Sequence, residues 1–149
     1  MVTPRREADL AGFAPWLAVV EAFGAHLEVL DAATHDAAVA AISHLPFALS
    51  AALVHAVAAG PAWPAAQRLA ASGFRDMARL AGGDPAMYAA IARTNPAAML
   101  GALDLLLAEL GTLRGLLEDG EGGQEWFTGA RGLRASWLSG RTAAGRPVR

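Results

Sequence analysis

Two short segments place polar side chains inside apolar stretches, where they could do chemistry. The first is Ser43–Pro46, whose sequence is Ser-His-Leu-Pro. Proline lacks a backbone donor and disfavours helix at the residue before it, so a broken helix here would open a polar pocket. His44 would then face a ligand, or, alternatively, form a core histidine bonded to a nearby carbonyl oxygen.

The second segment is Gly73–Arg79, whose sequence is Gly-Phe-Arg-Asp-Met-Ala-Arg. Asp76 and Arg79 have the spacing that puts two side chains on one face of a helix. Arginine presents a planar fork of donors that suits a carboxylate. Arg79 could therefore bind an acidic ligand, with Asp76 beside it. The alternative is a local salt bridge between the two, which would add little to stability.

Other chemistries find no support in the sequence. The chain has no cysteine, which excludes disulfides, thiol nucleophiles and cysteine metal ligands. The four histidines lack the spacing of a zinc protease, and we expect no metal site. The glycines of Gly120–Gly123 follow a predicted helix and not a strand, so they form no dinucleotide-binding loop. A net charge of -2 without a basic stripe argues against nucleic-acid binding.

The composition predicts a single domain. The chain has 149 residues, of which 54% are hydrophobic and 17% charged, enough for one hydrophobic core. The longest uncharged stretch, Ala37–Gln67, exceeds the roughly 20 residues that span a bilayer. It contains three prolines and much alanine. We therefore expect a buried core helix, in the middle of a bundle or in a subunit interface, no membrane partner and a cytoplasmic protein. Ala37–Ala59 and the leucine stripe of Met99–Leu117 both suit a two-fold interface.

Apolar residues recur at helical spacing along most of the chain. One alternating stretch, His26–Leu30, predicts a short strand. Asp84-Pro85 and Asn95-Pro96 each predict an N-cap followed by proline in the first helical turn. A kink or break is expected near Leu45, and a frayed tail from Gly140. The predicted helices cover residues 7–23, 32–59, 65–71, 73–80, 85–94, 96–118 and 124–138.

The order of these segments resembles the C-terminal helical domain of the prephenate dehydrogenase family, which includes arogenate dehydrogenases. The resemblance covers about residues 3–118, and its several linked motifs make it specific. The sequence departs from the family at Phe47, where a second histidine is common, at Ala78 (often Thr) and at Tyr88 (often Trp). The matching stretches are His35-Asp36, Ser43–Pro46, Gly73–Asp76 with Arg79–Ala81, Asp84-Pro85 and Asn95.

The resemblance implies a mainly α fold, a helical-bundle dimerisation domain like the C-terminal domain of 6-phosphogluconate dehydrogenase, with one vestigial strand near the N-terminus. In the family, Thr-Pro precedes the last helix and strand of a nucleotide-binding domain, a place that Thr3-Pro4 fits. Residues 1–30 would be the remnant of that domain. Residues 31–119 would form the dimerisation and substrate-binding domain, and 120–149 a C-terminal helix and tail.

The family catalyses NAD(P)-dependent oxidative decarboxylation of prephenate to 4-hydroxyphenylpyruvate in tyrosine biosynthesis. The resemblance implies that Arg79 binds a substrate carboxylate, that Asp76 orients or lines the site, and that His44 and Tyr88 face or flank it. Catalytic and cofactor-binding residues are not expected in this chain, which would be inactive alone and bind no NAD or NADP. We expect a homodimer with prephenate or tyrosine as ligand. The alternative is a standalone helical module that binds an aromatic acid or regulates a partner.

Overall fold

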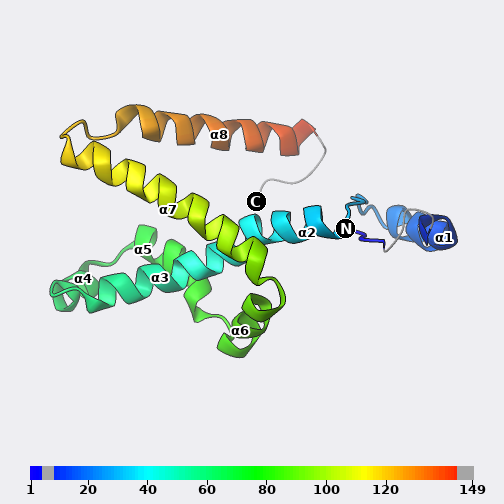
Figure 1. The fold of residues 1–149 in the computed structure, drawn as a ribbon, viewed down its shortest axis with the longest axis horizontal. Coiled ribbons are helices and arrows are strands. Elements are labelled where there is room, and N and C mark those ends of the chain that lie inside the picture. Colours follow the sequence, from blue (N-terminus) through cyan, green and yellow to red (C-terminus); the bar gives the residue numbers. More distant parts are fainter. Residues whose placement is uncertain (5–8, 144–149) are drawn as a thin grey trace. The chain divides into compact units, whose positions relative to one another are not determined.

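The computed structural model describes residues 1–4 and 9–143, and these residues confirm the mainly α fold (Figure 1). Most predicted helices are present within a few residues of their expected bounds. The elements in chain order are α1 (Asp9–Ala22), α2 (Ala32–Val39), the π-helical turn η1 (Ala40–His44), α3 (Leu45–Ala59), α4 (Trp63–Leu69), α5 (Ser72–Ala78), the 3-10 turn η2 (Arg79–Gly82), α6 (Pro85–Thr94), α7 (Pro96–Glu118) and α8 (Gln124–Ala143).

The vestigial strand is reduced to one parallel bridge between Val2 and Val29. Val2 donates its N–H to the Glu28 carbonyl at 2.8 Å and accepts from the Leu30 N–H at 3.1 Å. Within the described part of the chain, the alternating residues 26–30 form no longer ladder with another strand. A strand without a neighbour leaves its backbone groups unpaired, so the pairing ends there.

Both ends of the helical region differ from the prediction. The expected start of the first helix, at residue 7, lies outside the described residues. The expected fraying from Gly140 is wrong up to Ala143, because α8 continues to that residue. Arg141 lies in the last turn of α8 with its guanidinium 5.7 Å from the centre of the Trp137 ring. A cation in the last turn favours helix continuation.

Of the two alternatives predicted near Leu45, a kink or a break, the break does not occur. Instead α2, η1 and α3 form one continuous helix of 28 residues. Within it the Leu45 N–H donates to the carbonyl of Ala40, five residues back. Such a widened π turn takes up one extra residue. It ends at His44, two residues before Pro46, which supplies no N–H to the continuous helix.

The chain divides into two compact units at Leu103. In the first unit α3 is the central element, and it packs against η2, α5 and α4. Figure 1 shows α5 lying beside α3. This packing brings the Ser43–Pro46 segment and the Gly73–Arg79 segment together, although they are far apart in the sequence.

The second unit is a helical hairpin made of the later part of α7 and of α8. The turn between them uses Gly120, Gly122 and Gly123, all in the left-handed region with φ of 74°, 67° and 69°. Glycine adopts this conformation without steric strain. Trp126 on α8 donates its indole N–H to the Glu109 carboxylate on α7 at 2.9 Å.

Burial is low for a chain this hydrophobic. Among the described residues, the buried hydrophobic side chains are Ala40, Phe47 and Ala102, with Ser50 the one buried polar residue. The predicted single core and buried core helix are therefore wrong for one copy of the chain. Two helices, Ala32–Ala59 and Pro96–Glu118, are long and apolar enough to cross a membrane, with 17% and 6% of their most apolar windows buried. Core helices of soluble proteins have the same length and composition.

Candidate functional site

The two chemistry-bearing segments meet at a cavity of about 210 Å³. One wall comes from η1 and the start of α3, and the other from α5 and η2. Asp76 and Arg79 both line it, as their spacing predicted. The lining residues are Ala41, Leu45, Pro46, Leu49, Asp76, Met77, Arg79 and Leu80. The result is a mostly apolar hollow with one cation and one carboxylate at its edge.

The Arg79 guanidinium is not neutralised by a carboxylate within the part of the chain that the structure describes. The salt bridge considered between Asp76 and Arg79 does not form. Asp76 instead lies 3.7 Å from the Nε of Arg75, with both side chains more than 70% exposed. Such an exposed, long pair contributes little to stability. Arg79 therefore keeps its donors available for an acidic ligand.

His44 lies beside the cavity and does not line it. Its neighbours in sequence, Leu45 and Pro46, are lining residues. The Nδ1 atom of His44 is buried without a hydrogen-bond partner among the described residues. The ring centre lies 6.0 Å from that of Phe47. Among the described residues no carbonyl binds Nδ1, and His44 is not one of the residues that line the hollow around Arg79.

Tyr88 also lies outside the cavity lining. Its ring stacks on Phe47, with centres 4.1 Å apart and planes 8° from parallel. Its hydroxyl donates to the carbonyl oxygen of Leu80 at 2.9 Å. The hydroxyl thus contacts the residue next to Arg79. The structure brings Asp76 and Arg79 together directly, and connects Tyr88 to them through the backbone of η2.

Ser50 and Gly83 are site residues that the sequence prediction missed. Ser50, on α3, is 2% exposed, and its hydroxyl accepts the Ala81 N–H at 2.9 Å. Gly83 lies so close to the Tyr88 ring that a Cβ at this position would overlap the phenol. A serine within an apolar helix was the available signal for Ser50, because a buried hydroxyl requires a partner. Gly83 gave no local signal.

The family motif residues His35, Asp36 and Asn95 form a separate contact. His35 Nδ1 lies 2.9 Å from the Asp36 carboxylate. Asn95 was predicted as an N-cap for the helix at Pro96; the structure gives its amide nitrogen a hydrogen bond to the Asp36 carbonyl at 2.8 Å. This bond joins α2 to the α6–α7 junction. The other predicted cap is confirmed, since the Asp84 carboxylate accepts the Ala86 N–H at 2.9 Å.

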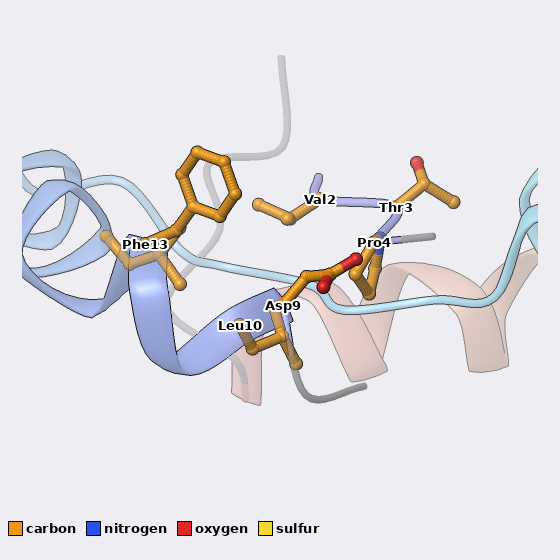
Figure 2. Close-up of a pocket in the computed structure, with 7 residues that line it drawn as sticks. Val2, Thr3, Pro4, Asp9, Leu10 and Phe13 are labelled. Atoms are coloured by element: carbon orange, nitrogen blue, oxygen red, sulfur yellow. The ribbon is translucent and has the colours of Figure 1, made fainter. Parts of the chain in front are cut away.

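A second cavity, of about 500 Å³, lies near the N-terminus (Figure 2). Its walls are apolar apart from Thr3 and Asp9, and it contains none of the predicted site residues. The lining residues are Val2, Thr3, Pro4, Asp9, Leu10, Phe13 and Leu17. Figure 2 shows the Phe13 ring near the Val2 side chain, with Asp9 beside Pro4.

The described residues show neither a cluster of metal-ligating side chains nor a glycine loop between a strand and a helix. No three His, Asp or Glu side chains within residues 1–4 and 9–143 come together as metal ligands. The glycines at residues 120–123 join two helices, whereas a dinucleotide loop joins a strand to a helix. The arrangement around Arg79 can bind an acidic, partly apolar molecule, but the described residues add neither nucleophile nor redox group there.

Comparison with known proteins matches residues 31–128 to the family described as "Prephenate dehydrogenase, dimerization domain". The chain is 29% identical over 137 residues to prephenate dehydrogenase of Bacillus subtilis, with 90% of this chain and 37% of that protein aligned. It is 34% identical to the crystal structure of Synechocystis arogenate dehydrogenase, with a TM-score of 0.83, covering 91% of this chain and 50% of that one.

A prephenate dehydrogenase from A. aeolicus, solved with hydroxyphenyl propionate and NAD+, shares the fold. It is 24% identical, with a TM-score of 0.76, covering 92% of this chain and 48% of that one. The chain therefore spans between about a third and a half of these relatives. The family match covers most of the chain and includes the helices that line the Arg79 cavity. The chain belongs to the prephenate dehydrogenase dimerization-domain family.

Proposed function

We propose that this chain is the dimerising and substrate-binding part of a prephenate or arogenate dehydrogenase, a cytoplasmic enzyme of tyrosine biosynthesis. Membership of the family supports the class of enzyme. The aligned relatives are longer, so the remaining functions of the enzyme belong to parts that this chain does not align with.

The proposed reaction is an oxidative decarboxylation. A hydride leaves the ring carbon that bears the hydroxyl and passes to the nicotinamide of NAD or NADP, carbon dioxide departs, and the ring becomes aromatic. Because the residues described here show no glycine loop between a strand and a helix, we assign them no role in the hydride step. Their proposed task is to hold the substrate.

The Arg79 cavity is the single observation that carries this proposal. Prephenate combines a six-membered carbon ring with two carboxylates. The cavity offers a matching combination, with an apolar wall from Leu45, Pro46 and Leu49 and an arginine that has no acidic partner among the described residues. A guanidinium binds a carboxylate through two parallel hydrogen bonds, which fixes orientation as well as affinity.

We assign the other predicted residues supporting parts in the same site. Asp76, at the cavity edge, would orient the ligand or Arg79. His44 and Tyr88 flank the cavity: His44 immediately precedes the lining residue Leu45, and Tyr88 hydrogen-bonds the lining residue Leu80. The buried Nδ1 of His44 requires a partner, which a bound ligand or an ordered water could supply.

We also propose that the chain forms a homodimer. Leucines 100, 103, 107, 110 and 117 follow one another along α7 at helical spacing and are 37–61% exposed. An exposed apolar surface of this kind is unstable in water and is typical of obligate interfaces. Two-fold pairing would cover the same stripe on both copies.

The experiment that tests substrate binding is calorimetric titration of the chain with hydroxyphenyl propionate, the molecule present in the A. aeolicus structure. We expect Arg79→Ala to weaken binding by at least about tenfold, because it removes a charge-assisted hydrogen bond. Arg75→Ala is the matched control, since Arg75 is exposed and does not line the cavity. Equal affinities in both variants would contradict the assignment of Arg79.

The alternative is a standalone helical module that binds an aromatic acid or regulates a partner. This alternative uses the same cavity as the dehydrogenase proposal and differs in the ligand that binds there. Titration with tyrosine in the same calorimeter separates the two. Tyrosine binding with no response to hydroxyphenyl propionate would favour the regulatory module. Binding of neither ligand by a folded chain would contradict both proposals for the cavity.

A further inference from the structure

We infer that Ser50 and Tyr88 are positioning residues that fix the orientation of Arg79 by holding the backbone of η2 from two sides. This inference rests on the proposed function, because it takes Arg79 as the group that binds the substrate carboxylate. It adds two residues that act through Arg79 and do not themselves line the cavity.

The two hydrogen bonds fall on consecutive residues of the turn that Arg79 begins. The Tyr88 hydroxyl, from α6, donates to the Leu80 carbonyl at 2.9 Å. The Ser50 hydroxyl, from α3, accepts the Ala81 N–H at 2.9 Å. One bond therefore fixes an acceptor and the other a donor, immediately after Arg79. Both groups belong to the one peptide unit that joins Leu80 to Ala81, so this peptide plane cannot rotate without breaking at least one of the bonds.

The turn needs such external support because of its own geometry. It is a 3-10 turn of four residues between α5 and α6, ending at Gly82. Hydrogen bonds in 3-10 helices are poorly aligned, and short runs of them are less stable than α-helix. Without Ser50 and Tyr88, η2 would depend on these weak internal bonds. Arg79 would then sample many orientations and lose affinity through the entropy of ordering.

The two positioning groups are themselves fixed. Ser50 is 2% exposed and lies on the central helix of its unit. The Tyr88 ring stacks on Phe47, which is 8% exposed. Gly83 lets the phenol approach the backbone, because any side chain there would overlap it. A buried hydroxyl is costly unless it is hydrogen-bonded, so Ser50 in an apolar helix is explained by its bond to η2.

The first test measures positioning without any ligand. Nuclear magnetic resonance on the full 149-residue chain would follow amide exchange at Ala81 and the order of the Arg79 backbone amide and Nε. We expect Ser50→Ala to speed Ala81 exchange by about fivefold or more, the loss of one ordinary hydrogen bond, and to lower the order of Arg79. Arg75, exposed on α5, should not change.

Two further variants complete this test. Tyr88→Phe removes only the hydroxyl and keeps the ring on Phe47, so it tests the second bond even if Ser50→Ala does not fold. Ser139→Ala is the control for deleting a hydroxyl, because Ser139 lies on α8 and donates to the Ala135 carbonyl within that helix. Unchanged Arg79 order in folded Ser50→Ala and Tyr88→Phe would overturn the inference, whatever ligand binds.

The second test is a double-variant cycle with hydroxyphenyl propionate as the probe. If Ser50 acts through Arg79, Ser50→Ala weakens binding about fivefold in the wild-type chain and has no further effect in Arg79→Ala. A general structural role would give the same loss in both backgrounds, and that additivity would overturn the inference. Failure of Arg79→Ala itself to weaken binding would contradict the proposed function, while the exchange result on η2 would still stand.

Discussion

The chain contains two long apolar helices that differ in what they bury. The 28-residue helix Ala32–Ala59 buries Ala40, Phe47 and Ser50 against other elements of its own unit. The 23-residue α7 buries Ala102 alone among its residues and leaves most of its leucines exposed. Both helices make polar contacts, but of different kinds: the bond of Ser50 to η2 is part-buried, whereas the Glu109–Trp126 bond and the Arg114–Glu118 pair of α7 are exposed.

The two helices have similar apolar compositions, so composition alone would assign them the same role. Their different burial assigns them different roles. An apolar helix that contains a buried hydroxyl, a proline and a π turn specifies contacts at particular residues. An apolar helix with a regular leucine stripe specifies a surface, which any complementary helix face can cover. We therefore associate the first helix with the substrate site and α7 with assembly, and the following predictions test that assignment.

The largest effect is expected from charges in the α7 stripe. The double variant Leu103→Glu/Leu107→Glu would bury four carboxylates in a two-fold dimer, at several kcal/mol each, so we expect a loss of more than about 5 kcal/mol of association free energy. Sedimentation velocity should show monomers. Thr112→Glu, on the opposite face of α7, is the control, and a dimer that persists in the double variant would contradict the assembly role of the stripe.

Phe47→Ala tests the site helix in the same way. Removing this buried ring deletes the stack on Tyr88 and leaves a cavity, which should lower the free energy of unfolding by about 3–5 kcal/mol. Phe127→Ala is the control, because Phe127 is 54% exposed. Urea unfolding at one fixed protein concentration measures both, since dimer stability depends on concentration. Similar losses in the two variants would remove the distinction between buried and exposed aromatic residues.

Comparing Gly83→Ala with Gly82→Ala distinguishes the effect of steric overlap from the effect of reduced backbone flexibility. A Cβ at Gly83 overlaps the Tyr88 phenol, whereas one at Gly82 meets nothing within 4 Å. We expect Gly83→Ala to cost about 1–3 kcal/mol through overpacking, and Gly82→Ala to be neutral or slightly stabilising. Thermal unfolding of the two variants measures the difference. Equal melting temperatures would show that the phenol can move aside.

The smallest effect concerns the start of the site helix at low pH. Hydrogen bonds from the Thr34 side chain and backbone lower the pKa of the Asp31 carboxyl, which caps α2. A lowered pKa means that this cap contributes fully above the ordinary carboxyl pKa of about 4 and is lost as pH falls through the lowered value. Amide exchange at Thr34 should follow this loss, and Asp31→Asn should abolish its pH dependence.

Local patterns predicted the elements well where the determinant lies within a few residues. Asp84-Pro85 fixes the start of α6 through a side-chain cap and proline geometry, and the leucine spacing fixes α7. Asp76 and Arg79, three residues apart across the end of α5, both line the cavity. In each case the physical cause is contained in one turn of helix.

The features that sequence could not predict depend on distant partners. Ser50 bonds a residue 31 positions away, and Asn95 bonds one 59 positions away. Gly83 is required by the nearby Tyr88 ring, whose position depends in turn on its stack with Phe47 on α3. The predicted core helix was wrong for one copy because apolar composition indicates that a surface will be covered, and does not indicate whether the cover comes from the same chain.

The π turn at Ala40–His44 also changes which positions of this helix share a face. In a straight α-helix, His35 and His44 would lie about 180° apart around the axis, since nine steps of 100° separate them. One extra residue absorbed in the widened turn reduces that angle to about 80°. Because the widened turn absorbs the extra residue, deleting one residue from it would restore a regular α-helix and leave Ser50 on the face that meets Ala81. A deletion outside the turn would instead rotate everything after it by about 100° relative to the motif at His35-Asp36.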